Sequence, residues 1–417
     1  MEADPLAPER SSLLTARLEC LLDGIQATTG LSLSPQEIST LCLQIKNDVI
    51  GMGPLTELMS DPSITDILVN GAQSIWVDRS GKLELTQLHF DDESHLRRFV
   101  DRYIAAQGKH LDSATPAVDA RLPDGSRMHV VIPPLSPAGT LVSIRCFRES
   151  HSSLEDLIQS GMLSREMADL LIFAVQGGLN IVIAGGAGAG KTTLLNAVSE
   201  FIPSNERIVT VEESAELALR NRHVVTLEAK QGNGEGRGRF DLRMLVRQAL
   251  RMRADRIIVG EVRGEEVFDM LQAMTVGHDG SLTTIHANNP HQALKRMETL
   301  ALLSNSRAPR EAIRDMIESA VQLIIQVARL SDGTRRITSI CELHDAPGCI
   351  EVVELFRLRK TALSINRELH VSGTAPISRS THTDCGIRPL FLETIRAKGI
   401  EPPRSLRLIW EVAEMPS

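Results

Sequence analysis

The first part of the chain carries a helical hydrophobic pattern. Leucine and isoleucine residues recur between positions 13 and 25 at the spacing of one helix face, and Gly30 ends the pattern. The residues before them, MEADPLAPERSS, include three acidic residues and two prolines. We therefore expect residues 1–45 to be a helical segment with a disordered start.

Short strand patterns begin at Ile64. The runs ITDILVNG, SIWVD and KLELTQLHF are separated by the turn-forming residues Asn70-Gly71 and Arg79-Ser80-Gly81. A helical run, SHLRRFVDRYIAA, and two strand-like runs, MHVVIPP and LVSIRCF, follow. This pattern predicts a small α+β domain over residues 46–147, and the polar, serine-rich stretch 148–160 is predicted to be a linker.

From Ser164 onward the pattern becomes helix, strand, glycine loop, helix and strand. The runs LNIVIAG, RIVTVE, RIIVGE and SLTTIHA are almost continuously apolar, which is typical of parallel strands covered by helices on both faces. We predict an α/β core over residues 161–345. The remaining residues, 346–417, mix strand-like and polar segments, and their pattern indicates no activity.

Composition narrows the class of protein. A chain of 417 residues exceeds one hydrophobic core, and no apolar run approaches the roughly 20 residues of a membrane span. The acidic, proline-containing start differs from a secretory signal, so we expect a cytoplasmic protein. The net charge of -8 and the scarcity of Trp and Tyr argue against nucleic-acid binding. The six cysteines form no CxxC pair, which disfavours zinc and disulfide frameworks.

The most specific motif is a glycine-rich loop that fits G-x-x-x-x-G-K-[ST] between the apolar strand NIVIA and a helix. In such loops backbone N–H groups and the helix N-terminus bind phosphates, the lysine reaches the β and γ oxygens, and the hydroxyl binds Mg²⁺. We predict ATP and Mg²⁺ as ligands, with Thr192 on the metal. The predicted nucleotide-binding residues are Gly185, Gly186, Ala187, Gly188, Ala189, Gly190, Lys191, Thr192 and Thr193.

Carboxylates end two of the apolar strands. Glu261 follows RIIVG and is a candidate to orient or deprotonate the attacking water, whereas Gly260 stands where most P-loop proteins have Asp. Glu212 and Glu213 end RIVTV, and Glu212 is a candidate to hold the metal through a water. Glu216 fits a solvated residue in the first turn of a helix equally well.

Histidine and arginine residues complete the candidates. His286 ends the run SLTTIHA and is a candidate γ-phosphate sensor, although a structural histidine also fits this position. Neither His278 nor His286 has a zinc-like spacing to a cysteine or a carboxylate. Arg243, Arg247 and Arg251 repeat every fourth residue, which is equally typical of a solvated or ion-paired helix face.

These motifs resemble those of the CpaF-like secretion ATPases of tight-adherence (Flp-type) pili, a branch of the type II/IV secretion ATPase superfamily. The resemblance extends from about residue 47 to residue 300 and rests on DILVNG, VDARLPDGSR, SIRCF, LNIVIAGGAGAGKTTLLNAVSEFIP, ERIVTVEESAEL, RQALRMRADRIIVGEVRG and GHDGSLTTIHANNP, in family order. A weaker match, GIRPLFLETIRAKGI, lies near the C-terminus. Glu213 replaces a usual aspartate and Ala254 a usual proline.

The resemblance implies a RecA-like P-loop core and a hexameric ring in which the small N-terminal domain packs over the nucleotide. It also implies site roles: Arg121, Arg127 and Arg145 as γ-phosphate contacts, Glu212 as an acidic-box residue, Glu261 as the catalytic acid, His286 as the signature histidine, and Arg263 as a link to a neighbouring subunit.

The function expected from the sequence is a motor that hydrolyses ATP to drive Flp/Tad-type pilus assembly or protein secretion. The resemblance implies a peripheral position at the inner membrane, against a platform protein. Two alternatives stay open, namely a DNA-transfer or type II secretion motor of the same superfamily and a nucleotide-gated scaffold without turnover. The lack of a tetracysteine zinc motif counts against the type II and type IV pilus branch.

Overall fold

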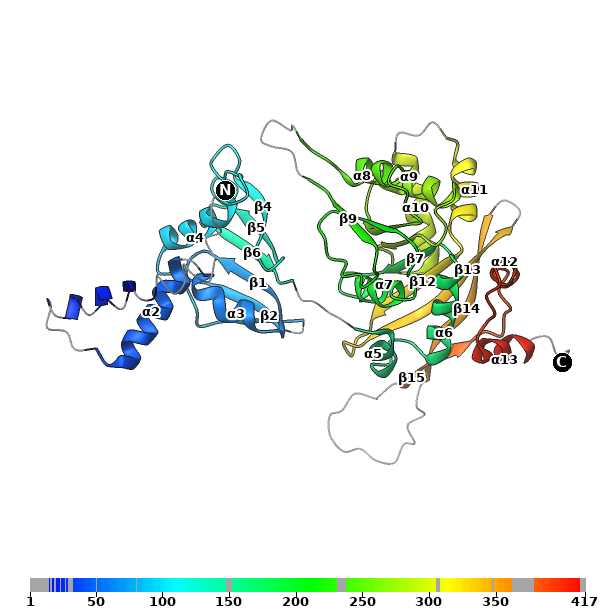
Figure 1. Ribbon diagram of the computed structural model, residues 1–417, viewed down its shortest axis with the longest axis horizontal. Helices are drawn as coiled ribbons and strands as arrows, with labels where there is room; N and C mark the ends of the chain where they lie inside the picture. The colour runs from blue at the N-terminus through cyan, green and yellow to red at the C-terminus, as the bar shows by residue number, and fades with distance from the viewer. Residues whose placement is uncertain are drawn as a thin grey trace, which may run out of the picture. The chain divides into compact units, whose positions relative to one another are not determined.

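The computed structural model describes residues 33–49, 51–79, 81–147, 152–230, 238–304, 308–346, 349–361 and 379–412, together with scattered positions between 15 and 28. The chain forms two compact units, Met1–Glu149 and Ser150–Ser417 (Figure 1). Of the helix predicted between residues 13 and 25, the described positions 15, 17, 18, 20–22, 24 and 25 are all helical, and the other positions lie outside the described residues. Among the helices described, none is long and apolar enough to cross a membrane.

The first unit is built on a six-stranded sheet with the order β3-β2-β1-β6-β5-β4, in which every neighbouring pair is antiparallel. Its elements are α2 (Pro35–Val49), η1 (Gly53–Leu55), α3 (Thr56–Ser60), β1 (Ile64–Asn70), β2 (Ile75–Arg79), β3 (Lys82–Leu85), α4 (Glu93–Ala105), β4 (Ala117–Arg121), β5 (Arg127–Val131) and β6 (Leu141–Arg145).

The two faces of this sheet differ because apolar and polar residues alternate along its strands. One face buries residues such as Ile67, Met128 and Ile144 in a core shared with Leu96 and Phe99 of α4. The opposite face carries polar and half-exposed side chains. The small α+β domain predicted from the sequence is therefore present.

The second unit contains a nine-stranded sheet with the order β15-β14-β13-β12-β7-β11-β10-β8-β9. The strands from β12 to β9 in this order are parallel, and β13, β14 and β15 extend the sheet antiparallel. Its elements are α5 (Leu154–Gln159), α6 (Arg165–Gln176), β7 (Ile181–Gly185), α7 (Lys191–Ser199), β8 (Ile208–Glu212), β9 (Val224–Glu228), α8 (Leu242–Ala249), β10 (Arg256–Val262), α9 (Glu266–Thr275), β11 (Leu282–Ile285), α10 (Pro290–Leu303), α11 (Arg310–Ala320), β12 (Leu323–Arg329), β13 (Arg335–Ala346), β14 (Cys349–Thr361), β15 (Arg379–Asp384), α12 (Phe391–Ala397) and α13 (Arg404–Val412).

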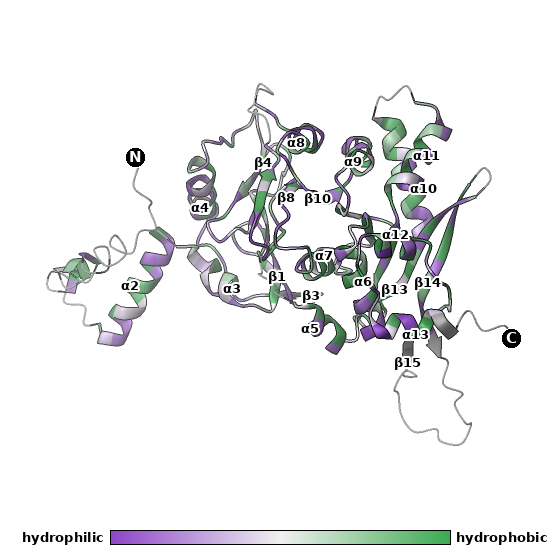
Figure 2. Cartoon of the chain, turned by 45° about the vertical axis from the view of Figure 1, so that its right-hand side comes forward, coloured by the Kyte–Doolittle hydropathy of each residue, from purple (hydrophilic) through white to green (hydrophobic). Residues whose placement is uncertain are grey.

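Helices cover both faces of this sheet, as the continuously apolar strands predicted. Ile181 and Ile183 of β7 pack into a core with α5, α6, α7, α12 and α13. Val182 and Ala184, which point the other way, pack into a core with α8, α9, α10 and α11. The covering helices carry both hydrophobic and hydrophilic residues, as α10 and α11 show in Figure 2. The predicted α/β core beside a smaller α+β unit is confirmed.

Two segments lie differently from the division expected from the sequence. The stretch 148–160, predicted to be a linker, contains α5, whose Leu154 and Leu157 are buried in the same core as α6 and α7; residues 148–151 lie outside the described residues. The stretch 346–417 supplies β14 and β15 to the large sheet, and Ile395 and Trp410 of its two helices are buried in that core. Residues 347–348, 362–378 and 413–417 of this stretch are outside the description.

Candidate nucleotide-binding site

The glycine loop connects β7 to α7, and its conformation needs glycine at several positions. Gly188 and Gly190 have φ values of 65° and 99°, in the left-handed region that side chains disfavour. At Gly185, a Cβ atom would lie 2.6 Å from the carbonyl oxygen of Val327, which is too close. The spacing of the motif is thus explained by backbone geometry.

The start of α7 is suited to binding an anion. Gly190 is the N-cap and has no side chain to accept a hydrogen bond from the first turn, so backbone N–H groups of that turn can face a ligand. Lys191 is buried, and its Nζ donates to the carbonyl oxygens of Gly185 and Gly186 at 3.2 and 3.1 Å. Its ammonium group therefore lies over the loop, where phosphates bind in P-loop proteins.

The other candidate residues follow adjacent parallel strands at the same edge of the sheet. The order β7, β11, β10 and β8 brings the glycine loop, His286, Glu261 and Glu212 together, because parallel strands share one carboxyl edge. Oε1 of Glu261 lies 2.7 Å from Nε2 of His286 and 3.8 Å from Nζ of Lys191. Nζ of Lys191 is 3.5 Å from Nε2 of His286. Lys191, Glu261 and His286 form one cluster, which we call the loop-edge cluster.

The environment of His286 favours its neutral form. Burial lowers the pKa of His286 from its usual value, and the nearby charge of Lys191 lowers it further, while Glu261 has the opposite effect. In the neutral ring, Nε2 can accept a hydrogen bond from Nζ of Lys191, 3.5 Å away, whereas Oε1 of Glu261, although 2.7 Å from Nε2, makes no hydrogen bond within the described part of the chain.

Arg263 connects two of the acids. Its Nε donates to Oε2 of Glu261 at 2.6 Å, and NH1 donates to Oε2 of Glu213 at 2.9 Å. Within the chain Arg263 therefore contacts two acids, and the link to a neighbouring subunit that the resemblance implies stays a prediction. Glu261 is therefore held by Arg263 through one oxygen and faces His286 with the other.

Glu212 has a positioning role that the sequence did not reveal. The side chain is buried, and Oε1 accepts hydrogen bonds from the backbone N–H groups of Glu216 and Leu217 at 2.8 and 2.9 Å. A Cβ atom at Gly260 would lie 2.9 Å from Cγ of Glu212. Because Gly260 has no side chain, the side chain of Glu212 can pack against its backbone. In the sequence, a glycine inside an otherwise apolar strand is the feature that could have indicated this close approach.

The three arginines of the first unit form a row. Arg121 lies opposite Arg127 in the β4–β5 pair, and Arg127 lies opposite Arg145 in the β5–β6 pair, so the three side chains share the open face of the sheet. Arg145 in turn lies opposite Asp66 of β1. Like charges directly opposite each other are unfavourable in a sheet, so this row is suited to an anionic ligand.

The helix arginines prove to be partly structural. Arg243 and Arg247 of α8 both contact the buried Asp269 of α9, each with an N–O distance of 2.7 Å, and Arg243 also pairs with Glu265. This is the ion-paired helix face that the sequence pattern left open as an alternative.

The residues present fit magnesium bound mainly through phosphate. In the described part of the chain, no group of three or more His, Cys, Asp or Glu side chains could hold a metal ion. Thr192 lies in the first turn of α7, at the position where P-loop proteins supply a hydroxyl ligand. Mg²⁺ typically takes one or two protein ligands together with substrate phosphates and water, and this donor set matches that pattern.

Comparison with known proteins shows the family. A profile described as "Type II/IV secretion system protein" matches residues 48–382. A putative conjugal transfer protein of Mycobacterium tuberculosis is 42% identical over 318 residues, which cover 75% of this chain and 90% of the relative. The type IV secretion system protein VirB11 of Brucella suis is 30% identical, over 74% of this chain and 92% of its own length.

A solved structure shows the same fold at lower identity. The pilus retraction motor PilT with bound ADP aligns with a TM-score of 0.52 and 17% identity, over 71% of this chain and 81% of PilT. Because the family profile spans most of the chain and includes both units, the chain belongs to the type II/IV secretion system protein family and is an ATPase of that family.

Proposed function

We propose that this chain is the ATP-hydrolysing motor subunit of a secretion or pilus-assembly system. The observation that carries the proposal is the loop-edge cluster, in which a carboxylate, a histidine and the loop lysine meet within 3.8 Å beside a glycine loop that fits phosphate. Phosphoryl transfer needs positioning and charge stabilisation more than covalent chemistry, and these residues can supply both.

In this mechanism the backbone of the loop and Lys191 bind the β- and γ-phosphates of ATP. Glu261 orients the attacking water and accepts its proton, while Arg263 keeps the carboxylate in place. Neutral His286, 2.7 Å from Glu261 and 3.5 Å from Lys191, is proposed to sense whether the γ-phosphate is present. Thr192 would hold Mg²⁺ together with phosphate oxygens and water, and the metal would supply charge neutralisation on the phosphates.

The arginine row is proposed to contact the γ-phosphate. Its support is the direct cross-strand register of Arg121, Arg127 and Arg145, which concentrates positive charge on one open sheet face. Glu212, whose Oε1 is committed to two backbone N–H groups, is proposed to shape the loop after β8 and to reach the metal only through a water.

Two kinds of transport system fit the motor. The order of the sequence motifs favours a tight-adherence pilus, in the CpaF-like branch, whereas similarity to a putative conjugal transfer protein and to the type IV secretion protein VirB11 favours conjugal transfer or type IV secretion. In either case we propose a hexameric ring in the cytoplasm, peripheral to the inner membrane and acting on a platform protein there.

A phosphate-release assay on the purified protein separates the motor from a scaffold that binds ATP without turnover. We expect steady release of phosphate from Mg-ATP by the parent protein. Lys191→Ala should lose most nucleotide binding and turnover, because it removes the mobile cation nearest the phosphates. If the parent protein bound ATP tightly but released no phosphate in any oligomeric state, the scaffold would be supported instead.

A further inference from the structure

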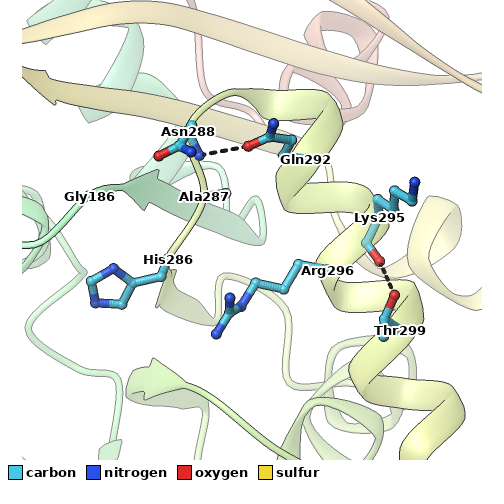
Figure 3. A pocket seen from close by; sticks show the side chains of 8 residues that line it. All are labelled: Gly186, His286, Ala287, Asn288, Gln292, Lys295, Arg296 and Thr299. Carbon is cyan, nitrogen blue, oxygen red and sulfur yellow. Dashed lines mark hydrogen bonds between the residues drawn. The ribbon is translucent and has the colours of Figure 1, made fainter.

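A pocket of about 440 Å³ lies beside the glycine loop, between Gly186, the segment that follows β11, and one face of α10. Figure 3 shows Arg296 extending from α10 toward His286, whose ring points away from Arg296 in this view, and Asn288 and Gln292 lie at another side of the pocket. The pocket shares Gly186 and His286 with the proposed hydrolysis, but no step of that hydrolysis uses its α10 residues. Its position next to the loop-edge cluster raises the question of which ligand it accepts.

The pocket is electropositive. Arg296 and Lys295 of α10 both line it, and within the part of the chain that the structure describes neither side chain forms an ion pair. Arg296 extends from the helix toward His286, whereas the ammonium of Lys295 points away from that ring (Figure 3). The charge of Arg296 is close enough to His286 to contribute to lowering the pKa of the imidazole. The nearby acid, Glu261, is already engaged by Arg263 and faces His286.

The pocket is also open toward the loop. A Cβ atom added to Gly186 would meet nothing within 4 Å, so the loop backbone leaves space on this side. A small anion leaving the γ position could therefore pass Gly186 and His286 without displacing Lys191 from the loop.

We propose that this pocket receives the orthophosphate produced by hydrolysis and that Arg296 is its principal ligand. The inference rests on the proposed ATPase function and adds a product site to it. The planar guanidinium can bind two phosphate oxygens at once, which suits a multiply charged tetrahedral anion. An acidic side chain of a second copy is the competing occupant. Phosphate is favoured because the pocket begins at Gly186 and His286, where the γ-phosphate would be cleaved.

The test measures binding of inorganic phosphate to the full-length protein loaded with Mg-ADP, by isothermal titration calorimetry. Arg296→Gln should weaken phosphate binding by roughly tenfold or more, since a hydrogen-bonded charge is removed. Arg296→Lys should keep affinity close to that of the parent. The matched control is Arg251→Gln, which removes the same charge from an exposed position on the same unit, and ADP affinity should be the same in all four proteins.

Three results would overturn the inference. The first is absence of phosphate binding by a parent protein that hydrolyses ATP, which leaves the proposed function intact. The second is an equal loss of affinity in Arg296→Gln and Arg251→Gln, which would show a general charge effect. The third is unchanged phosphate affinity in Arg296→Gln together with loss of oligomers in light scattering, which would assign the pocket to a second copy. A parent protein without any turnover would instead count against the ATPase itself.

Discussion

The two acids at the carboxyl edge of the large sheet, Glu261 and Glu212, have different surroundings and therefore different proposed roles, one in the chemical step and one in positioning the backbone. Glu261 faces His286 and Lys191 through one oxygen and is held by Arg263 through the other. Glu212, also an acid at a strand end, instead accepts two backbone N–H groups. Their sequence contexts look alike, and the different hydrogen-bond partners are what distinguish them.

The packing of Glu212 against Gly260 predicts a stability effect. Gly260→Ala would place a Cβ atom 2.9 Å from Cγ of Glu212 on the neighbouring strand. Overpacking of this kind costs about 1–3 kcal/mol, so thermal or denaturant unfolding should show a loss of that size. Gly186→Ala is the matched control, because its Cβ would meet nothing within 4 Å, and it should unfold like the parent. Equal stability of Gly260→Ala and the parent would mean that Glu212 does not pack as described.

Among the helices, strands and loops, the sequence best predicts those whose formation depends on the local pattern of apolar and polar residues. The buried parallel strands β7, β8, β10 and β11 are continuous apolar runs, and the glycine loop has its motif, so both could be predicted. Strand β4, with the sequence AVDAR, has only one large apolar residue, so it shows no clear strand pattern. Strand β14 belongs to the large sheet only through pairing with β13, a tertiary contact that local periodicity does not encode.

In the candidate site too, the sequence predicted the features that depend on local pattern and missed those that depend on tertiary contacts. The residue types at the strand ends could be chosen from the sequence, because parallel strands share an edge. Two features of the site could not be predicted from the sequence: the contact of Glu212 with Gly260, and the row formed by Arg121, Arg127 and Arg145. Both depend on which strands are neighbours and in what register they pair.

The arginine row predicts an effect specific to the triphosphate. Arg127→Ala and Arg145→Ala should each lower ATP turnover while leaving ADP affinity nearly unchanged, because the proposed contact is to the γ-phosphate. Turnover and ADP binding are measured side by side. Arg98→Ala, an exposed arginine of α4 in the same unit, is the control and should match the parent in both. Equal losses for ATP and ADP would point to a structural role for the row.

At the scale of the whole molecule, groups suited to phosphate occur in both compact units, the loop-edge cluster in one and the arginine row in the other. A protein with phosphate-binding groups in two units is expected to change assembly with nucleotide. Light scattering at micromolar protein should show a larger species with Mg²⁺ and a non-hydrolysable ATP analogue than without nucleotide. A strict monomer under both conditions would contradict the proposed ring.

The central claim, that this chain turns over ATP through Glu261, is tested most directly by phosphate release from Glu261→Gln. Gln keeps the shape of the side chain and removes its charge. We expect this variant to bind Mg-ATP about as well as the parent and to lose on the order of a hundredfold or more in turnover, the range typical of a general base. If turnover and nucleotide affinity fell together and excess Mg²⁺ restored part of both, Glu261 would be a metal-binding residue. Turnover equal to that of the parent at every Mg²⁺ concentration would contradict the account and leave Glu212 as the acid to examine.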